Sequence, residues 1–344
     1  MSDHSYRANN GPPQSHVLRS RSSCRLEHDV HSRKAGRTRP SSRRRPYGLS
    51  RDAFMVRPAF DNEMALAQRT SDIGAAYGQV VEAMRERGRV LVAFSGGIDS
   101  ALVARMAFDA LGDGALAVLA DAESLSRREL QEAVSEAAEI GIPLRTVRVS
   151  ELANAQYTAN PVNRCYFCRK ELGAALKPLA AEFGYHAIAD GVNLSDLGDH
   201  RPGIQAMNEE GFWHPLVEFG FAKDDVRALA RQLGLSFHDK PSNACLSSRI
   251  AYGEVITLDK LRRVEAAEEA IRSMGFRVVR VRAHEGVARI EVPVEDLPRI
   301  VSPETSQRVV QAVRDAGFVY VTIDLRGYRS GSMNEDLPRR DDPA

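Results

Sequence analysis

The stretch Val90-Leu91-Val92-Ala93-Phe94-Ser95-Gly96-Gly97-Ile98-Asp99-Ser100 decides the fold, because an apolar run ends there in a polar turn with two glycines. Five consecutive apolar residues are typical of a buried parallel strand. Apolar residues at helical spacing follow over 101–111, so the turn joins a strand to a helix. We therefore place the turn at the carboxyl end of a central strand, where parallel sheets bind their ligands.

The same alternation continues along the chain on both sides of this stretch. Short apolar runs over 115–120, 144–149 and 186–189 predict three more strands, and helices are expected over 62–87 and 126–140. This pattern predicts an α/β fold, a parallel sheet with helices on both faces.

A smaller unit is predicted in the C-terminal part of the chain. Its order is helix, strand, strand, helix, strand, over 258–274, 278–283, 288–292, 303–316 and 319–325. This αββαβ order predicts a small α+β domain that serves in association and in closing the site.

The first 60 residues are rich in Arg and Ser and lack apolar periodicity, which indicates disorder. An upstream translation start (with Met55 or Met64 as the true one), a transit peptide and a nucleic-acid-binding arm are alternative interpretations. The chain is thus expected to comprise a disordered extension, an α/β domain with the cysteine motifs, a small α+β domain and a flexible tail, over 1–60, 61–253, 254–330 and 331–344.

The charge of the 344-residue chain is distributed unevenly. Its net charge is +1, but 12 Lys and Arg against 3 Asp and Glu lie in residues 1–51, which leaves the remainder net acidic. An acidic folded part argues against broad nucleic-acid binding. No apolar run reaches the roughly 18 residues of a membrane span, so we expect a cytoplasmic protein that does not bind membranes.

The turn over 95–100 has the composition of a phosphate-binding loop. Gly96 and Gly97 allow backbone N–H groups to approach an anion, Ser95 and Ser100 add hydroxyl donors, and the following helix adds its N-terminus. A Walker A loop is excluded because its spacing and its lysine are missing. A turn that needs glycine only for its geometry is the alternative. The string resembles the SGGxDS signature of the PP-loop ATP pyrophosphatases, an adenine nucleotide α-hydrolase-like fold, which implies ATP binding and AMP transfer to a substrate oxygen.

Two aspartates are candidate Mg²⁺ ligands, because this hard cation prefers carboxylate oxygens and phosphate. They are Asp99 in the turn and Asp190 after the fourth strand. Asp99 could instead cap the helix that follows it. Asp121 and Ser124 end the second strand, where related enzymes hold the adenine.

Three cysteines form the second informative set, namely Cys165, Cys168 and Cys245. A disulfide framework is not expected in a cytosolic chain of this size. The thiols could hold a cluster, form a zinc site that lacks one ligand, or combine a redox pair with a nucleophile. The neighbouring Arg164, Arg169 and Arg249 are expected to lower the thiol pKa values and favour thiolates, as metal binding or sulfur transfer requires.

Four strings together resemble the LarE family, the ATP-dependent sulfur transferases of nickel-pincer nucleotide cofactor synthesis. They are Asn163-Arg164-Cys165-Tyr166-Phe167-Cys168, Asp190-Gly191-Val192-Asn193, Asp196-Leu197-Gly198-Asp199-His200-Arg201-Pro202-Gly203 and Ala244-Cys245-Leu246-Ser247-Ser248-Arg249-Ile250-Ala251-Tyr252-Gly253. The resemblance covers about residues 65–330. It implies that the carboxylates of pyridinium-3,5-dicarboxylate mononucleotide are adenylated, with release of pyrophosphate, and converted to thiocarboxylates.

The resemblance also implies roles for individual residues. Cys245 would be the sulfur-bearing catalytic residue, either sacrificial or, with Cys165 and Cys168, a ligand of a [4Fe-4S] cluster; the three cysteines favour the cluster. Asp99 and Glu268 would be catalytic, with Glu265 and Glu269 as alternatives to Glu268. Arg249, Arg280 and Arg282 would bind the substrate.

The residues themselves support part of this assignment. Arg280 and Arg282 alternate onto one strand face, which suits a phosphate or carboxylates, unless they form salt bridges to Glu291. Trp213 and His214 are expected only to pack.

The expected partners are the mononucleotide, other enzymes of the nickel-pincer pathway and further copies of this chain. A tRNA thiolase, an amide-forming synthetase and a zinc-stabilised nucleotide-binding module are the alternatives. The net acidic charge after residue 51 argues against the tRNA thiolase, and an amide-forming synthetase has no need of thiols.

Overall fold

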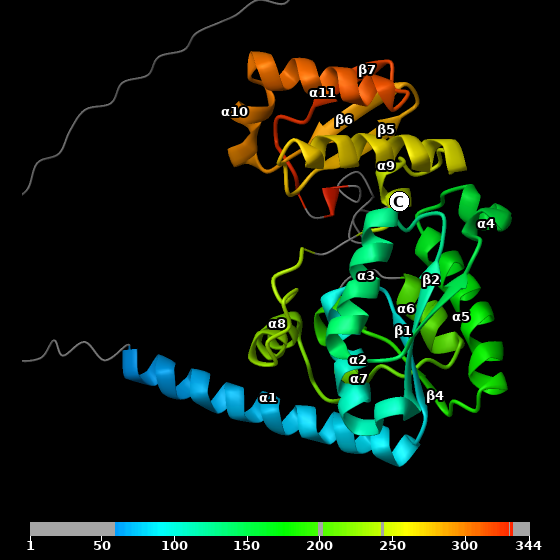
Figure 1. Cartoon of the computed structure of the whole chain (residues 1–344), viewed down its shortest axis with the longest axis vertical. Helices are drawn as coiled ribbons and strands as arrows, with labels where there is room; N and C mark the ends of the chain where they lie inside the picture. The colour runs from blue at the N-terminus through cyan, green and yellow to red at the C-terminus, as the bar shows by residue number, and fades with distance from the viewer. Residues whose placement is uncertain (1–58, 199–201, 242–243, 330, 333–344) are drawn as a thin grey trace, which may run out of the picture. The chain divides into compact units, whose positions relative to one another are not determined.

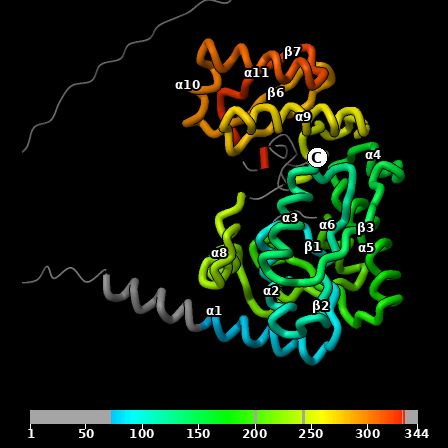
Figure 2. The backbone as a smooth tube through the Cα atoms, viewed as in Figure 1, coloured from blue at the N-terminus to red at the C-terminus, as the bar shows by residue number. Residues whose placement is uncertain are grey.

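The computed structural model describes residues 59–198, 202–241, 244–329 and 331–332, and side chains from residue 72 onward. Figures 1 and 2 trace their path. Apart from a few positions at their inner ends, the extension expected over 1–60 and the tail expected over 331–344 lie outside these residues, as does Cys24. Residues 199–201, which belong to the third motif string, and residues 242–243, which precede the fourth, also lie outside them. The described residues belong to one compact unit, and the boundary expected after residue 253 stays a prediction.

The described residues form the following elements. They are α1 (Ala59–Arg87), β1 (Val90–Phe94), α2 (Ile98–Leu111), η1 (Gly112–Gly114), β2 (Ala115–Asp121), α3 (Arg127–Ile140), β3 (Leu144–Arg148), η2 (Glu151–Ala153), α4 (Ala155–Thr158), α5 (Arg164–Glu182), β4 (Ala187–Ala189), η3 (Leu194–Gly198), α6 (Pro202–Glu209), α7 (Pro215–Glu218), α8 (Lys223–Gln232), η4 (Leu246–Arg249), α9 (Leu258–Ser273), β5 (Arg280–His284), β6 (Val287–Glu291), η5 (Val294–Asp296), α10 (Leu297–Ile300), α11 (Pro303–Asp315) and β7 (Tyr320–Ile323).

The first sheet is parallel, and its strand order is β3-β2-β1-β4. All five residues of the central strand β1 are buried, because both faces of the sheet are covered. Val90, Val92 and Phe94 pack in a core with α1, α2, α3 and α8, whereas Leu91 and Ala93 pack in a core with α5 and α6. Figure 1 shows these helices on the two sides of the sheet, which confirms the predicted α/β fold.

The second sheet has the order β5-β6-β7, with β5 antiparallel and β7 parallel to β6. Apolar residues of α9, α11 and these strands form a separate core. The observed order α9, β5, β6, α11, β7 is the predicted αββαβ order, with the short α10 added. Ile250 forms a β-bridge to Ala283 and so joins the segment that follows Cys245 to this sheet.

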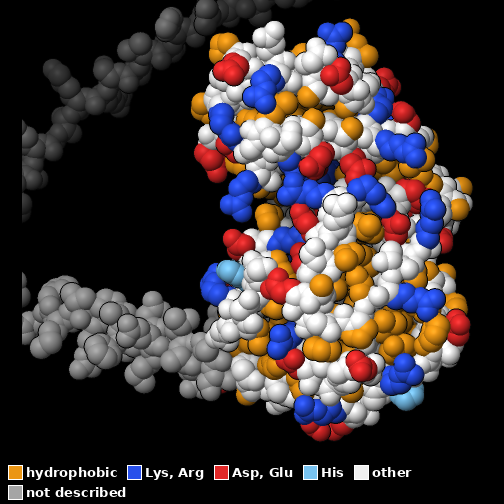
Figure 3. All heavy atoms as spheres, viewed as in Figure 1, with side chains coloured by type: hydrophobic (Ala, Val, Ile, Leu, Met, Phe, Trp, Pro, Cys, Tyr) orange, Lys and Arg blue, Asp and Glu red, His pale blue; other side chains and the backbone are white. Residues whose placement is uncertain are grey.

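The surface carries charged side chains of both signs (Figure 3). On the face drawn in Figure 3, basic side chains lie among acidic ones. Within the described ranges, every helix is too short or too polar to cross a membrane.

Candidate functional site

The turn after β1 is a tight loop whose polar groups bond one another. Ser100 Oγ accepts a hydrogen bond from Ser95 N at 3.1 Å and donates one to the Gly97 carbonyl at 2.9 Å. Gly96 has φ +69°, and a Cβ there would stand 2.6 Å from Ala133 Cβ, so this position requires glycine. Gly97 is the N-cap of α2, and no described side chain caps the helix there. The first N–H groups of α2 are therefore available to an anion.

Two lysines from distant positions contact this loop, and the sequence analysis singled out neither. Lys223, the first residue of α8, forms an ion pair with Asp99 Oδ2. Lys240 Nζ donates a hydrogen bond to the Gly96 carbonyl at 2.9 Å and pairs with Glu136 at 2.5 Å. Only the fold brings these lysines to the loop, because more than a hundred positions separate them from it in the sequence.

The two aspartates expected to hold magnesium lie at the same edge of the sheet. Asp99 Oδ1 accepts a hydrogen bond from Asn193 Nδ2 at 3.1 Å, so this carboxylate bonds to side chains and does not cap α2. Asp190 Oδ1 accepts from Val192 N at 3.0 Å and lies 2.7 Å from His214 Nδ1. Its buried Oδ2 has no hydrogen-bond partner among the described residues. His214, expected only to pack, thus orients this carboxylate.

The string 190–193 packs directly against the loop. A Cβ on Gly191 would stand 2.5 Å from Ser100 N and 2.8 Å from the Asp99 carbonyl carbon, so the two backbones touch where Gly191 lies. Trp213 forms a β-bridge to Ala189 and extends this edge of the sheet. The described residues contain no group of three or more His, Cys, Asp and Glu arranged to hold a metal ion.

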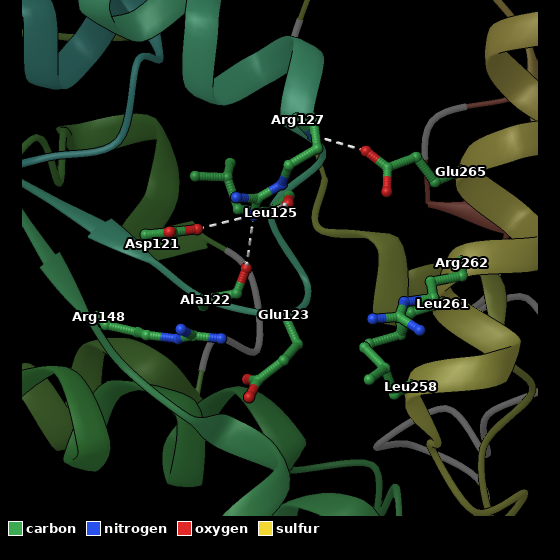
Figure 4. A pocket seen from close by; sticks show the side chains of 10 residues that line it. All are labelled: Asp121, Ala122, Glu123, Leu125, Arg127, Arg148, Leu258, Leu261, Arg262 and Glu265. Atoms are coloured by element: carbon green, nitrogen blue, oxygen red, sulfur yellow. Dashed lines mark hydrogen bonds and ion pairs between the residues drawn. The ribbon is translucent and has the colours of Figure 1, made fainter.

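The residues after β2 line a cavity of about 270 Å³ (Figure 4). Asp121 pairs with Arg127 at 2.7 Å, and Arg127 N donates to Glu265 Oε1 at 2.5 Å, which connects the start of α3 to α9. The cavity is lined by Asp121, Ala122, Glu123, Leu125, Arg127, Arg148, Leu258, Leu261, Arg262 and Glu265. Of the two residues expected near adenine, Asp121 lines the cavity, whereas Ser124 is buried beside it.

The segment that carries Cys245 is joined to the end of β2. Leu246 N donates a hydrogen bond to the Ser124 carbonyl at 2.8 Å. Cys245 is the N-cap of η4 and precedes Leu246, so the bond of Leu246 to the turn after β2 places Cys245 beside that turn. The structure therefore brings the expected sulfur-bearing residue to the sheet edge where ATP is expected.

Three arginines hold this segment by its backbone carbonyls. Arg249 Nη1 donates to the carbonyls of Ala244 and Cys245, Arg164 Nη1 to that of Ser247 at 3.1 Å, and Arg282 Nη1 to that of Ser248 at 2.8 Å. Arg249 and Arg164 are almost completely buried. A charged donor on each of four consecutive or near-consecutive carbonyls leaves this backbone little freedom.

Glu268 holds Arg249 through two hydrogen bonds. Its Oε1 accepts from Arg249 Nε at 2.9 Å and from Val281 N at 3.0 Å, and its Oε2 accepts from Arg249 Nη2 at 3.1 Å and Arg272 Nη2 at 2.6 Å. Both oxygens are thus engaged within the protein. Of its two alternatives, Glu265 lines the cavity and Glu269 is exposed.

Arg280 and Arg282 are both buried on β5. Arg282 pairs with Glu291 at 2.7 Å, as the alternative interpretation of this strand proposed. Burial, and then the positive charge of Arg249, lowers the pKa of Arg280. Arg249 and Arg280 are therefore crowded together beside the Cys245 segment, and Glu268 and Glu291 offset part of the positive charge there.

The three thiols lie close enough to influence one another. Burial raises the pKa of Cys168, with Glu151 adding to the effect, and burial raises the pKa of Cys245, with Cys165 adding to it and Arg164 opposing it. Arg169 lowers the pKa of Cys168, and Arg164 and Arg249 lower that of Cys245, as expected, but burial outweighs them, so the expected net decrease in these two pKa values is wrong. Cys165 itself is exposed.

Two further residues that the sequence analysis missed support the segment. Tyr157 Oη lies 2.6 Å from Ser247 Oγ and donates to Glu151 Oε2 at 3.0 Å. Asn160, buried at φ +53°, donates to the Ala251 carbonyl at 2.7 Å. An asparagine tolerates this backbone region, but no sequence pattern indicated either role.

Comparison with known proteins gives consistent results. Residues 71–171 match the NAD synthase family model. An uncharacterised protein of Synechocystis sp. is 48% identical over 254 residues, which cover 74% of this chain and 95% of that protein. Pyridinium-3,5-bisthiocarboxylic acid mononucleotide synthase of Lactiplantibacillus plantarum is 40% identical over 261 residues, which cover 76% and 94%. An uncharacterised protein of Methanocaldococcus jannaschii is 27% identical over 242 residues, which cover 70% and 91%.

These similarities agree with the site. The glycine loop lies within the region that matches the NAD synthase model, and the similarity to the synthase extends over nearly its whole length. The protein is thus an enzyme of the PP-loop ATP pyrophosphatase superfamily, in which ATP and Mg²⁺ are used. Given its 40% identity to the Lactiplantibacillus plantarum synthase, the chain belongs to the LarE family.

Proposed function

We propose that this enzyme adenylates the carboxylates of pyridinium-3,5-dicarboxylate mononucleotide and converts them to thiocarboxylates, as a sulfur transferase of nickel-pincer cofactor synthesis. The observation that carries the proposal is the hydrogen bond from Leu246 N to the Ser124 carbonyl at 2.8 Å. It joins the Cys245 segment to the sheet edge that carries the phosphate-binding loop. An acyl adenylate formed there would lie near a sulfur.

The first step would be attack of a substrate carboxylate oxygen on the α-phosphorus of ATP. The bond from this phosphorus to the bridging oxygen breaks, and pyrophosphate leaves with the electron pair. The uncapped N–H groups at the start of α2 suit the negative charge of the leaving group. Attack of sulfur on the acyl carbon would then release AMP and leave the thiocarboxylate.

We propose Asp99 and Asp190 as the magnesium ligands and Ser95, Gly96, Gly97 and Ser100 as the loop that binds the triphosphate. Support for Asp190 comes from its buried Oδ2, which has no hydrogen-bond partner among the described residues. A buried carboxylate oxygen without a donor is costly unless a cation or water completes its environment. The crowded Arg249, Arg280 and Arg282 suit the anionic groups of the substrate, and the cavity after β2 suits the adenosine.

The transferred sulfur would come either from a sulfide on an iron–sulfur cluster or from Cys245 itself, and we propose the cluster route, in which the cluster supplies it. Cys165, Cys168 and Cys245 fit a [4Fe-4S] cluster in number and in chemistry, since three thiols influence one another's ionisation. The described residues contain no group of three ligands arranged to hold a metal ion, so binding of a cluster would require the three thiols to move closer together. Such a cluster would supply an open iron site for a transferable sulfide. In the alternative route Cys245 gives up its own sulfur and becomes dehydroalanine.

We also propose that the enzyme is a homo-oligomer, that it exchanges its substrate and product with other enzymes of the same pathway, and that the second sheet belongs to a separate domain that closes the site. These proposals rest on the family resemblance and on the separate apolar core around the second sheet.

The decisive experiment measures pyrophosphate release and thiocarboxylate formation by mass spectrometry, with ATP, Mg²⁺ and the mononucleotide. Pyrophosphate release that depends on the mononucleotide supports the proposal; release that depends instead on tRNA or on ammonia would refute it. Iron–sulfur absorption after anaerobic reconstitution, lost in Cys165→Ala, Cys168→Ala and Cys245→Ala, supports the cluster route. A loss of one H₂S from the protein mass in a single turnover supports the sacrificial route.

A further inference from the structure

The phosphate-binding loop carries no positive charge of its own. The residues of the turn offer neutral N–H and hydroxyl groups, and the ionisable side chain in it is the acidic Asp99. A Walker A loop, by contrast, carries a lysine that reaches the β- and γ-phosphates of the nucleotide. A loop without this lysine must draw positive charge for a triphosphate from elsewhere in the fold, in addition to the metal.

The structure brings two lysines to this loop from one distant segment of the chain. Lys223 opens α8 and pairs with Asp99, whereas Lys240, beyond the end of α8, donates a hydrogen bond to the Gly96 carbonyl at 2.9 Å. The two ammonium groups thus contact the second residue of the loop, Gly96, and its fifth residue, Asp99, which lie on the two sides of Gly97.

We propose that Lys223 and Lys240 bind the β- and γ-phosphates of ATP and hold the pyrophosphate that it becomes; this inference rests on the proposed adenylation. Together they replace the lysine that a Walker A loop carries within its own sequence. The ligand chemistry is a pyrophosphate group, and the adenosine and substrate subsites are not part of the inference.

The surroundings of Lys240 hold its ammonium group in place before ATP binds. Its Nζ lies 2.5 Å from Glu136 and 3.2 Å from Glu132, both on α3, and 12% of its side chain is exposed. A lysine side chain ordinarily loses considerable rotamer entropy when it binds a ligand. Fixing Nζ at the loop beforehand reduces that loss.

Lys223 differs, because its partner is also a proposed metal ligand. With 28% of its side chain exposed, it neutralises Asp99 in the described structure. Binding of Mg²⁺ to Asp99 would supply that positive charge and release the ammonium group for a phosphate oxygen within reach. The contact of a purely structural lysine would not change in this way when ATP and Mg²⁺ bind.

A structural tie between the loop and α3 is the competing explanation of Lys240, and binding experiments separate the two. Pyrophosphate and AMP each probe one part of the nucleotide, so their dissociation constants are measured by calorimetry with Mg²⁺ present. The variants are Lys223→Gln, Lys240→Gln and Lys240→Arg. Lys177→Gln is the control, because Lys177 is half exposed and pairs only with Glu210 among the described residues.

We expect Lys223→Gln and Lys240→Gln each to weaken pyrophosphate binding by about tenfold or more, as loss of one charge-assisted contact implies. AMP binding should stay within about twofold in both, Lys240→Arg should recover part of the loss, and Lys177→Gln should match the wild type. Unchanged pyrophosphate binding, or an equal loss for AMP and pyrophosphate, would overturn the inference, since distortion of the loop affects both ligands. A wild-type protein that binds neither ligand would instead refute the proposed adenylation.

Discussion

The buried carboxylate of Glu268 gives the sharpest test of how the Cys245 segment is held. Glu268 has 0% exposure and accepts four hydrogen bonds, two of them from Arg249. Arg249 is itself 1% exposed and donates to the Ala244 and Cys245 carbonyls. Glu268→Ala therefore leaves a guanidinium buried without its counter-ion beside the segment that carries the sulfur.

The magnitude follows from this burial. Removal of one partner from a buried ion pair costs about 3–5 kcal/mol. For a folded unit of this size, the corresponding fall in the unfolding temperature is on the order of 10 °C. Glu269→Ala is the matched control, because the neighbouring carboxylate is 53% exposed and lies 3.7 Å from Arg272. Its effect should stay within about 0.5 kcal/mol.

The pH dependence of the same variant checks the electrostatic cause. Burial alone would raise the pKa of Glu268, but Arg249, followed by Arg280 and Arg272, outweighs burial and holds that pKa below its ordinary value. A depressed carboxyl pKa contributes stability above the unfolded-state pKa and loses it as the pH falls through the folded-state value. The stability difference between wild type and Glu268→Ala should therefore shrink below about pH 4.

The assay is thermal unfolding by circular dichroism between neutral and acid pH, combined with the rate at which a thiol reagent labels Cys245. Glu268→Ala should speed labelling because the carbonyls of the segment lose their fixed donor. Equal unfolding temperatures for Glu268→Ala and Glu269→Ala at neutral pH would refute the reasoning. So would a stability difference that does not change with pH.

Three further predictions concern the loop and its neighbours. Gly96→Ala should lower the unfolding temperature, because a Cβ there would stand 2.6 Å from Ala133. Gly97→Val should leave the unfolding temperature nearly unchanged but abolish pyrophosphate release. Equal shifts of the unfolding temperature in the two variants would contradict the assignment of Gly97 to the phosphate-binding surface of the loop. Gly191→Ala should destabilise the protein by about 1–3 kcal/mol, measured by urea unfolding, since its Cβ would stand 2.5 Å from Ser100 N, and a wild-type midpoint would contradict this contact. Tyr157→Phe should cost about 1–3 kcal/mol because it leaves buried acceptors unpaired, and a neutral effect on urea unfolding would show that the contact to Ser247 is dispensable.

The strand over 90–94 was predictable to the residue because both faces of the sheet are covered, so the apolar run has no interruption. The polar turn then marks its end without ambiguity. The helices over 62–87 and 101–111 instead begin at Ala59 and Ile98, since helix starts depend on capping contacts that periodicity does not record. The helices α6, α7 and α8 were not predicted, because two of them are short and the third has a strongly polar composition.

The candidate site was predictable where a local string carries the chemistry, and not where the fold brings distant charges together. The glycine loop, Asp190 and Cys245 fall into the first class. Lys223 and Lys240 belong to the charges that only the fold brings together, because no sequence pattern around them indicates a contact with the loop. The sign of the thiol pKa shift also failed for this reason: adjacent arginines are visible in a sequence, but the degree of burial that outweighs them is not.

The arginines around Cys245 act on its backbone before they act on its sulfur. Guanidinium groups that bind the carbonyls of residues 244, 245, 247 and 248 fix the direction of the bond from Cα to Cβ of Cys245, and so restrict its sulfur to the few positions that rotation about this bond allows. Both routes of sulfur delivery need this rigidity, since a sulfur that is aligned with an acyl carbon loses its rate advantage when it is displaced by about 1 Å. The same cations would stabilise a thiolate once ionisation occurs. Burial raises the pKa of Cys168 and of Cys245, and a metal ion bound to these thiols would oppose that effect, because metal binding favours the thiolate.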